Sequence, residues 1–341
     1  MTDEEIGLYS AEVLEDSIAN GVRLTTVLAT FPRFILAEVN THRVFSRNSA
    51  SSRAIPTKKL LDRMRAGENF TPATFNARVV GMGIGDELSA ADSARARSEW
   101  QAAMEDAMRH ASVLTDDDLN IDKSRANRLL EPFLWHTAII TSTEWSNFFA
   151  LRCPDADTPQ QDFPAQWEFQ QTAILMRQAM GASDPVELGP DEWHRPMVDN
   201  NIDGDALYRE DRYASDWEMT QRLNMVASRR LARVSFDKHT DTEPLGVSIS
   251  KAGDLVGSAH FSPTEHVARG IKRDDLTMHG DLAPKLMISF DQLAQAMNAQ
   301  GPEFIHAVDL GQVWCGNLRG YVQFRKTFAW EEDHGKAMQY R

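Results

Sequence analysis

The spacing of apolar positions predicts both strands and helices in this chain. Residues 22–31 (VRLTTVLATF) alternate and are rich in β-branched side chains, which predicts a strand. Pro32 suits the first position of a short amphipathic helix, and that helix would end near His42 and Arg43. The polar segment that follows, up to residue 54, is predicted to be a serine-rich loop.

Longer elements follow along the chain. A long amphipathic helix is predicted from Asp92 to about Val113, and another from Ser124 to just before Pro132. The β-branched run that opens residues 137–152 gives way to a helical pattern. Further helices are predicted around 167–175, 217–232 and 286–297, a strand at 320–328, a loop at 153–164 and long irregular structure at 183–215. The expected fold is a single α+β domain over residues 1–341, with 153–164 and 183–215 as insertions.

Composition narrows the possible functions. The chain has 341 residues, 42% hydrophobic content and a net charge of −14, which suits a globular protein and argues against general binding of nucleic acid. Between Arg33 and Arg65, however, eight basic residues face only two acidic ones. A local positive cluster in an acidic protein favours binding of a small anionic molecule.

Other functional classes lack their sequence signals. There are only two cysteines, so neither a disulfide framework nor a paired-cysteine metal site is expected. The N-terminus is acidic and the most hydrophobic stretch is interrupted by Pro32 and Arg33, so we expect a cytoplasmic protein without a membrane span. The nucleophile elbow, the phosphate-binding P-loop and the HExxH zinc motif do not occur.

The segment HRVFSRNSASSR, residues 42–53, carries the strongest motif. Its spacing, H-R-x-x-S-x-N-x-x-S-x-R, resembles the signature of flavin-dependent (ThyX-type) thymidylate synthases, with Thr41 in place of the first arginine of that signature. NFFALR (147–152), AQWEFQQ (165–171) and the pair Arg128 and Pro132 are similar to further segments of the family. We call residues 42–53 the signature segment.

Two more segments match the family in an unexpected order. The family normally begins with ARVSF and an H-x-T-P-F-E-H segment, both before the signature. Here ARVSF occupies residues 232–236 and HFSPTEH residues 260–266, both after it. The resemblance therefore implies a ThyX-like fold, with a mixed or antiparallel sheet and long helices, in a circularly permuted chain. Permutation is tolerated where the original termini lie close together at the surface.

The resemblance implies a role for each matched residue. FAD would be bound by His42, Arg43, Asn147, Ser235, His260 and Ser262. The nucleotide would be bound by Ser51, Ser52, Arg53, Arg128 and Arg152, and the catalytic residues would be Arg152, Ser51 and Arg53. Arg152 would stabilise negative charge that develops on the pyrimidine ring.

The implied reaction is the conversion of dUMP to dTMP. Methylenetetrahydrofolate would supply the carbon, NADPH would reduce the FAD, and the enzyme would be a homotetramer. Glu38 and Ser49 depart from the family, which expects Gln and Glu at those positions, and the arginine usual near Thr143 is missing. These departures leave two alternatives: methylation or hydroxymethylation of another nucleotide such as dCMP, or a non-catalytic nucleotide- or flavin-binding homologue. Cys153 is expected to be a buried spectator rather than a nucleophile.

Overall fold

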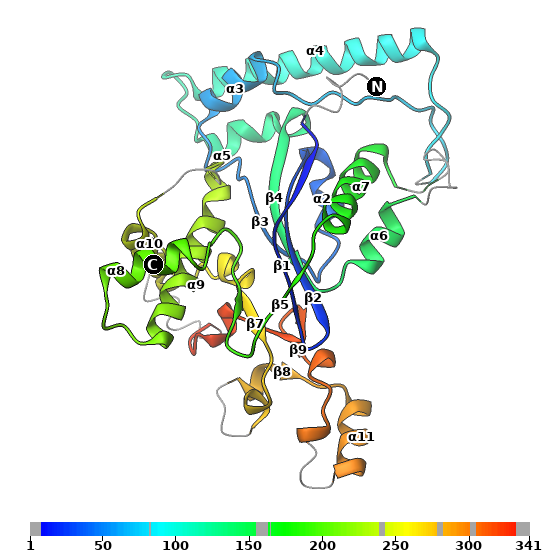
Figure 1. Cartoon of the computed structure of the whole chain (residues 1–341). Helices are drawn as coiled ribbons and strands as arrows, with labels where there is room; N and C mark the ends of the chain where they lie inside the picture. The colour runs from blue at the N-terminus through cyan, green and yellow to red at the C-terminus, as the bar shows by residue number, and fades with distance from the viewer. Residues whose placement is uncertain are drawn as a thin grey trace.

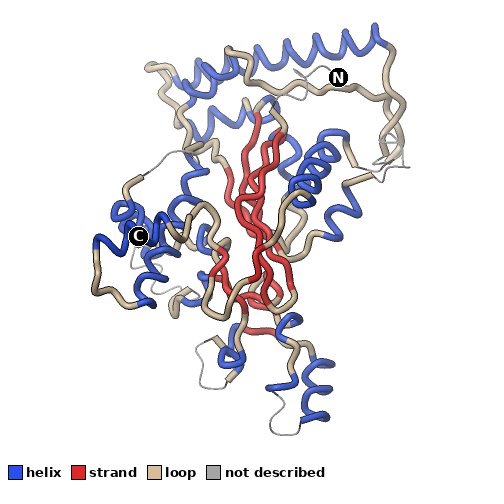
Figure 2. Tube along the Cα trace, viewed as in Figure 1, coloured by secondary structure: helices blue, strands red, loops and turns tan. Residues whose placement is uncertain are grey.

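A five-stranded mixed sheet runs through the centre of the computed structural model (Figures 1 and 2). Its strand order is β3-β4-β2-β1-β5, and each neighbouring pair is antiparallel except β1 and β5. The structure describes residues 8–331 apart from 82, 155–162, 164, 239–242, 278–281 and 301–304. The strands of this sheet are β1 (Ser10–Ala19), β2 (Val22–Pro32), β3 (Ser46–Ser49), β4 (Trp135–Ser142) and β5 (Val186–Glu187).

A tight hairpin joins β1 and β2. Asn20 and Gly21 form its two-residue turn with φ of 54° and 69°, and an Asn-Gly pair is the preferred sequence for a turn with two positive φ angles. The strand predicted at 22–31 is thus confirmed as β2. The strand β1 was not predicted, although the Asn-Gly pair between two segments of alternating character was a local signal for it.

Each face of the central sheet is covered by a helix. Val27 and Phe31 of β2 pack in one core with residues of α7 (Trp167–Gly181), α6 (Ser146–Arg152) and the segment around α2 (Leu36–Val39). Leu28 and Ile139 of β2 and β4 point to the other face and pack with α9 (Asp216–Ala232). Neighbouring side chains of a strand point to opposite faces, so the same strands contribute to both cores. Elements up to α7 in chain order cover one face of the sheet, and α9, later in the chain, covers the other.

Further helices surround this centre. The long helix α4 (Ala90–Thr115) lies across one end of the sheet beside α3 (Thr57–Arg65), as Figure 1 shows. The shorter α5 (Lys123–Ala126) continues into 3-10 turns that end in η3 (Glu131–Phe133). On the α9 side lie α8 (Ile202–Glu210) and α10 (Leu245–Gly257). The helices predicted at 92–113, 167–175 and 217–232 are confirmed.

The C-terminal part of the described chain, together with β6 from the middle of the chain, builds two small antiparallel sheets. One has the order β10-β9-β8 and the other β11-β7-β6, and α11 (Phe290–Gln300) lies at the end of the molecule opposite α4 (Figure 1). Their strands are β6 (Trp193–His194), β7 (Ala268–Gly270), β8 (Leu286–Met287), β9 (Trp314–Cys315), β10 (Leu318–Arg319) and β11 (Tyr321–Gln323). Among the described residues, the helices are too short or too polar to cross a lipid bilayer.

Several sequence predictions were wrong in detail. The signature segment is not all loop, because residues 46–49 pair with β4 as the edge strand β3. Residues 183–215 contain β5, β6 and α8, since apolar residues such as Leu207 are buried in the core beside α9. Pro32 ends β2, and a 3-10 turn precedes the short helix. The strand predicted at 320–328 stops after Gln323.

Two more of the predicted elements are only partly confirmed. At 286–297 the helix begins at Phe290, because Leu286 pairs with β9 as part of β8. The loop predicted at 153–164 lies largely outside the described residues.

Candidate active site

The signature segment presents His42 in a turn between α2 and β3. The imidazole stacks on the Phe45 ring, with centroids 5.5 Å apart, and meets the Phe148 ring of α6 edge-on at 4.9 Å. Both phenylalanines are buried in the core that α7 covers. The aromatic packing therefore fixes the orientation of the His42 ring and brings α6 beside the signature segment.

Three buried polar atoms without a hydrogen-bond partner belong to side chains that interact at this place. They are Nε2 of His42, Oε2 of Glu38 and Nε of Arg152. The guanidinium of Arg152 also lies over the Phe169 ring, 4.8 Å from its centroid. Buried groups with unused hydrogen-bonding capacity are costly unless something binds them. The cluster formed by Glu38, His42 and Arg152 is thus a candidate for ligand contact among the described residues.

The electrostatics of the cluster keep His42 neutral. Burial lowers the pKa of His42, and the positive charges of Arg152 and Arg47 lower it further. Burial also lowers the pKa of the Arg152 guanidinium, which the carboxylate of Glu38 partly offsets. A neutral imidazole has one nitrogen that donates a hydrogen bond and one that accepts it, so His42 can contact a neutral polar ring edge.

The second half of the signature segment lies beside the carboxylate of Glu131. Ser52 is buried, and its hydroxyl donates to Oε1 of Glu131 at 2.7 Å. Arg128 and Arg33 bind the same carboxylate, each at 2.9 Å. Burial raises the pKa of Glu131, but these hydrogen bonds and charges lower it more. Two residues predicted to bind the nucleotide, Ser52 and Arg128, therefore contact a carboxylate of the chain itself.

Arg53 and Ser51 remain more accessible than Ser52. The Arg53 side chain is exposed, and the backbone N–H of Ser51 donates to the carbonyl of Ser235 at 3.1 Å. That hydrogen bond joins the signature segment to η5 (Arg233–Phe236), which holds most of the ARVSF segment. The structure thus brings Ser235 to the signature segment from far along the chain.

The HFSPTEH segment also lies beside the signature segment. Its central part forms η6 (Ser262–Glu265), which packs against β3 and α9. Ser262 and His260 are exposed, and Nδ1 of His260 lies 3.0 Å from the Ser258 hydroxyl. Arg43 and Asn147 are exposed as well.

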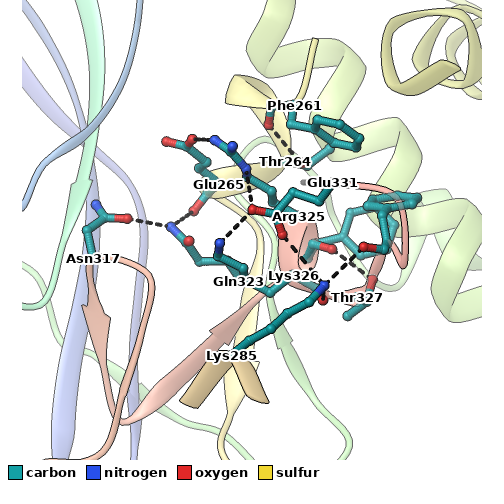
Figure 3. A network of polar contacts seen from close by, with 12 residues as sticks. Phe261, Thr264, Glu265, Lys285, Asn317, Gln323, Arg325, Lys326, Thr327 and Glu331 are labelled. Carbon is teal, nitrogen blue, oxygen red and sulfur yellow. Dashed lines mark hydrogen bonds and ion pairs between the residues drawn. The ribbon is translucent and has the colours of Figure 1, made fainter. Parts of the chain in front are cut away.

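Sequence analysis missed the residues that connect these segments. Figure 3 shows Gln323, whose amide donates to the carbonyl of Glu265 at 3.1 Å and to Oδ1 of Asn317 at 2.8 Å. The same amide donates to the hydroxyl of Ser46 in β3 at 3.2 Å. The sequence around a single glutamine in a short strand does not indicate these hydrogen bonds, because two of its partners, Ser46 and Glu265, are far away in the chain.

A cavity of about 320 Å³ lies beside the second half of the signature segment. Ala50 and Ser52 line it together with Arg33, Arg63 and Trp135. It mixes hydroxyl, cationic and aromatic groups, and it was not predicted. Cys153 is buried, as expected of a spectator.

The sequence model of the family described as "Thymidylate synthase complementing protein" (Thy1) matches residues 9–186. The chain belongs to the Thy1 family. The match includes the signature segment, Arg128, Asn147 and Arg152, and membership places the chain among flavin-dependent, ThyX-type methylases of pyrimidine nucleotides. The predicted α+β, ThyX-like fold is confirmed. The match ends before residues 232–236 and 260–266, so the permuted order of this Thy1 protein stays a prediction.

Solved structures gave further similarities. A UMP/dUMP methylase PolB from Streptomyces cacaoi, bound with 5-Br UMP, is 16% identical with a TM-score of 0.41, covering 51% of this chain and 88% of that one. The same methylase bound with 5-Br dUMP is 20% identical with a TM-score of 0.37, covering 47% and 67%. No curated protein matched the chain significantly.

Proposed function

We propose that this Thy1 protein transfers a one-carbon unit from methylenetetrahydrofolate to C5 of dUMP. The C5 proton leaves, a hydride reduces the transferred methylene to a methyl group, and the product is dTMP. FAD, reduced by NADPH, supplies that hydride when it is bound. The observation that supports the proposal is the cluster of Glu38, His42 and Arg152, which lies within the matched residues and carries three buried polar atoms without a hydrogen-bond partner.

The residues at this place fit a flavin. Nε2 of His42 is buried without a partner and can bond to a polar edge of the ring system. Arg43 and Asn147 are exposed and are the sequence neighbours of His42 and Phe148, whose rings are in contact, and Arg43 can neutralise a pyrophosphate. Ser235, His260 and Ser262 would complete the site.

Arg152 and the end of the signature segment would bind the nucleotide. Arg152 carries an unused N–H and would stabilise the negative charge that grows on the pyrimidine as C5 attacks the carbon. Arg53 is exposed and would bind the phosphate, with Ser51 beside it. The Ser52 hydroxyl would donate to the nucleotide only if it gave up its bond to Glu131, whereas Arg128 contacts Glu131 through Nη1 alone and is exposed.

The family resemblance motivates a homotetramer, because family sites are assembled from several subunits. Light scattering of the purified protein measures this directly. A monomer that binds FAD and turns over would contradict the proposed assembly without affecting the proposed reaction.

Glu38 favours a second candidate substrate. Its Oε2 is buried without a partner near Arg152, and a carboxylate only accepts hydrogen bonds. Both N3–H of uracil and the 4-amino group of cytosine can donate to it, so dCMP is the alternative nucleotide, with a methyl or hydroxymethyl product. A protein that binds nucleotide or flavin without turnover is the remaining alternative.

The decisive experiment combines flavin analysis with product mass. The purified protein is expected to be yellow and to release FAD on denaturation. Incubation with methylenetetrahydrofolate, NADPH and either dUMP or dCMP is followed by mass spectrometry of the nucleotide. A gain of a methyl group on dUMP supports the first candidate, a product from dCMP alone supports the second, and bound FAD without either product indicates a non-catalytic protein.

A further inference from the structure

Arg47 closes the turn that presents His42. Its Nη1 donates to the carbonyl oxygens of Val39 and His42, both at 3.2 Å. Val39 is the last residue of α2, and the carbonyls at a helix end lack partners within the helix. The His42 carbonyl also accepts the backbone N–H of Phe45 at 3.2 Å. One guanidinium thus ties the end of the helix to the backbone of the residue on which the cluster depends.

The edge strand explains why Arg47 reaches this turn. In β3 the residues Ser46 and Asn48 are buried, while Arg47 and Ser49 alternate with them and are half-buried. Burial lowers the pKa of Arg47, and the carboxylate of Glu265 in η6 opposes that effect. The guanidinium therefore interacts electrostatically with the HFSPTEH segment while it bonds to the signature turn.

Other contacts hold the neighbouring backbone but do not reach His42. The amide of Asn317 donates to the carbonyl of Val44 and to the Ser46 hydroxyl, each at 3.0 Å. Glu265 forms an ion pair with Arg325, as Figure 3 shows. These contacts fix the start of β3 from the C-terminal part of the chain. The side chain of Arg47 connects β3 to His42, because it donates hydrogen bonds to the backbone of the turn that contains His42.

We propose that Arg47 is a positioning residue that holds the His42 ring in the orientation needed to bind the flavin. The effect on flavin binding rests on the proposed function. The geometry of the turn does not depend on that function. Loss of the two hydrogen bonds would leave the turn held by its backbone hydrogen bonds alone, so the His42 ring could leave its contacts with Phe45 and Phe148 more readily. The ring would then have to be ordered again when the flavin binds, which weakens binding.

Arg47→Gln and Arg47→Lys test the proposal, with Arg273→Gln as the matched control. Arg273 also donates from one Nη1 to two backbone carbonyls, those of Ile305 and Val308, but far from the signature segment in η7. The first readout is the affinity for FAD, measured by titration of the flavin-free protein. Arg47→Gln is expected to weaken it about tenfold, in line with the usual strength of hydrogen bonds from a charged donor. Arg47→Lys should fall in between, and Arg273→Gln should bind FAD like the wild type.

The second readout is the imidazole signal of His42 in NMR of the flavin-free protein, assigned with His42→Gln. The charged groups around this ring are Arg47, Arg152 and Glu38. Arg47→Gln removes one of two cations, which by itself should raise the pKa of His42. Arg47→Lys keeps a positive charge but loses the guanidinium hydrogen bonds, so a raised pKa of His42 in that variant reports a loosened turn. If Arg47 acted on His42 through its charge alone, the pKa of His42 in Arg47→Lys would equal that of the wild type, even if the melting temperature fell as in Arg273→Gln.

The outcomes are separable. Wild-type FAD affinity in Arg47→Gln together with an unchanged His42 titration in Arg47→Lys would overturn the positioning role. If the wild-type protein bound no FAD, the proposed function would fail, and the NMR titration alone would then decide whether Arg47 holds the turn. A raised His42 pKa in Arg47→Lys, with Arg273→Gln unchanged, would support the role in either case.

Discussion

Lowering the pH from 7 to 5 is expected to destabilise the protein through three buried histidines. Burial lowers the pKa of His136, His194 and His266 to about 3, from an ordinary value of 6.5, so each is neutral in the folded state. His194 and His266 belong to a buried chain of hydrogen bonds through Thr26 and Thr141, with distances of 2.6–2.7 Å. Protonation of either imidazole would place a charge in this core.

The direction and size follow from proton linkage. Each folded-state pKa lies below its unfolded value, so between pH 6.5 and 3 the unfolded chain binds more protons than the folded protein. The free energy of unfolding therefore decreases as the pH is lowered. From pH 7 to 5 the loss is ~2 kcal/mol for each histidine, or ~6 kcal/mol for the three. Burial raises the pKa of Glu15 to about 7, which opposes this by ~2 kcal/mol because the folded state then binds the additional proton. A net loss of ~4 kcal/mol is a large part of the stability of a typical domain.

Urea unfolding at both pH values, followed by tryptophan fluorescence, measures the effect. His194→Asn should reduce the pH-dependent loss by ~2 kcal/mol, whatever it does to stability at pH 7. The exposed His110 on α4 provides the control, since His110→Asn should keep the full pH dependence. Equal stability at pH 7 and 5, or an unaltered pH dependence in His194→Asn, would refute the reasoning.

The remaining predictions concern single side chains. Arg53→Ala should raise KM for dUMP more than it lowers kcat, whereas Arg152→Ala should lower kcat; wild-type turnover by Arg152→Ala at saturating dUMP would remove its polarising role. Glu131→Ala should lower the free energy of unfolding by ~3 kcal/mol, because Arg33 would stay buried without its carboxylate, and a urea midpoint equal to that of the wild type would contradict this. Gly316→Ala should cost ~1–3 kcal/mol, since φ is 64° and the added Cβ would lie 2.5 Å from a carboxamide oxygen; thermal unfolding tests this, and an unchanged Tm would argue against it.

The signature spacing determined the family because it is a local property of twelve consecutive residues. The same holds for β2, α4, α7 and α9, whose apolar periods can be read in one window of sequence. The Asn20–Gly21 turn shows that β1 was also within reach of local reasoning.

Tertiary structure alone decided how these pieces meet. The polar residues of β3 form a strand only because β4 offers them a partner, and no periodicity within 46–49 indicates that. Sequence analysis named His42 and Arg152 separately, but their proximity depends on the packing of α6 against the signature turn.

The same reasoning explains the residues that sequence analysis assigned differently or missed. Ser52 and Arg128 were predicted to bind the nucleotide, but in the fold both contact Glu131 of η3. Thr141 and His266 are 125 positions apart, yet they share a hydrogen bond of 2.7 Å. Sequence determines the preferences of each segment, whereas hydrogen bonds and burial between distant segments exist only after the chain has folded, because they depend on which surfaces the fold brings together.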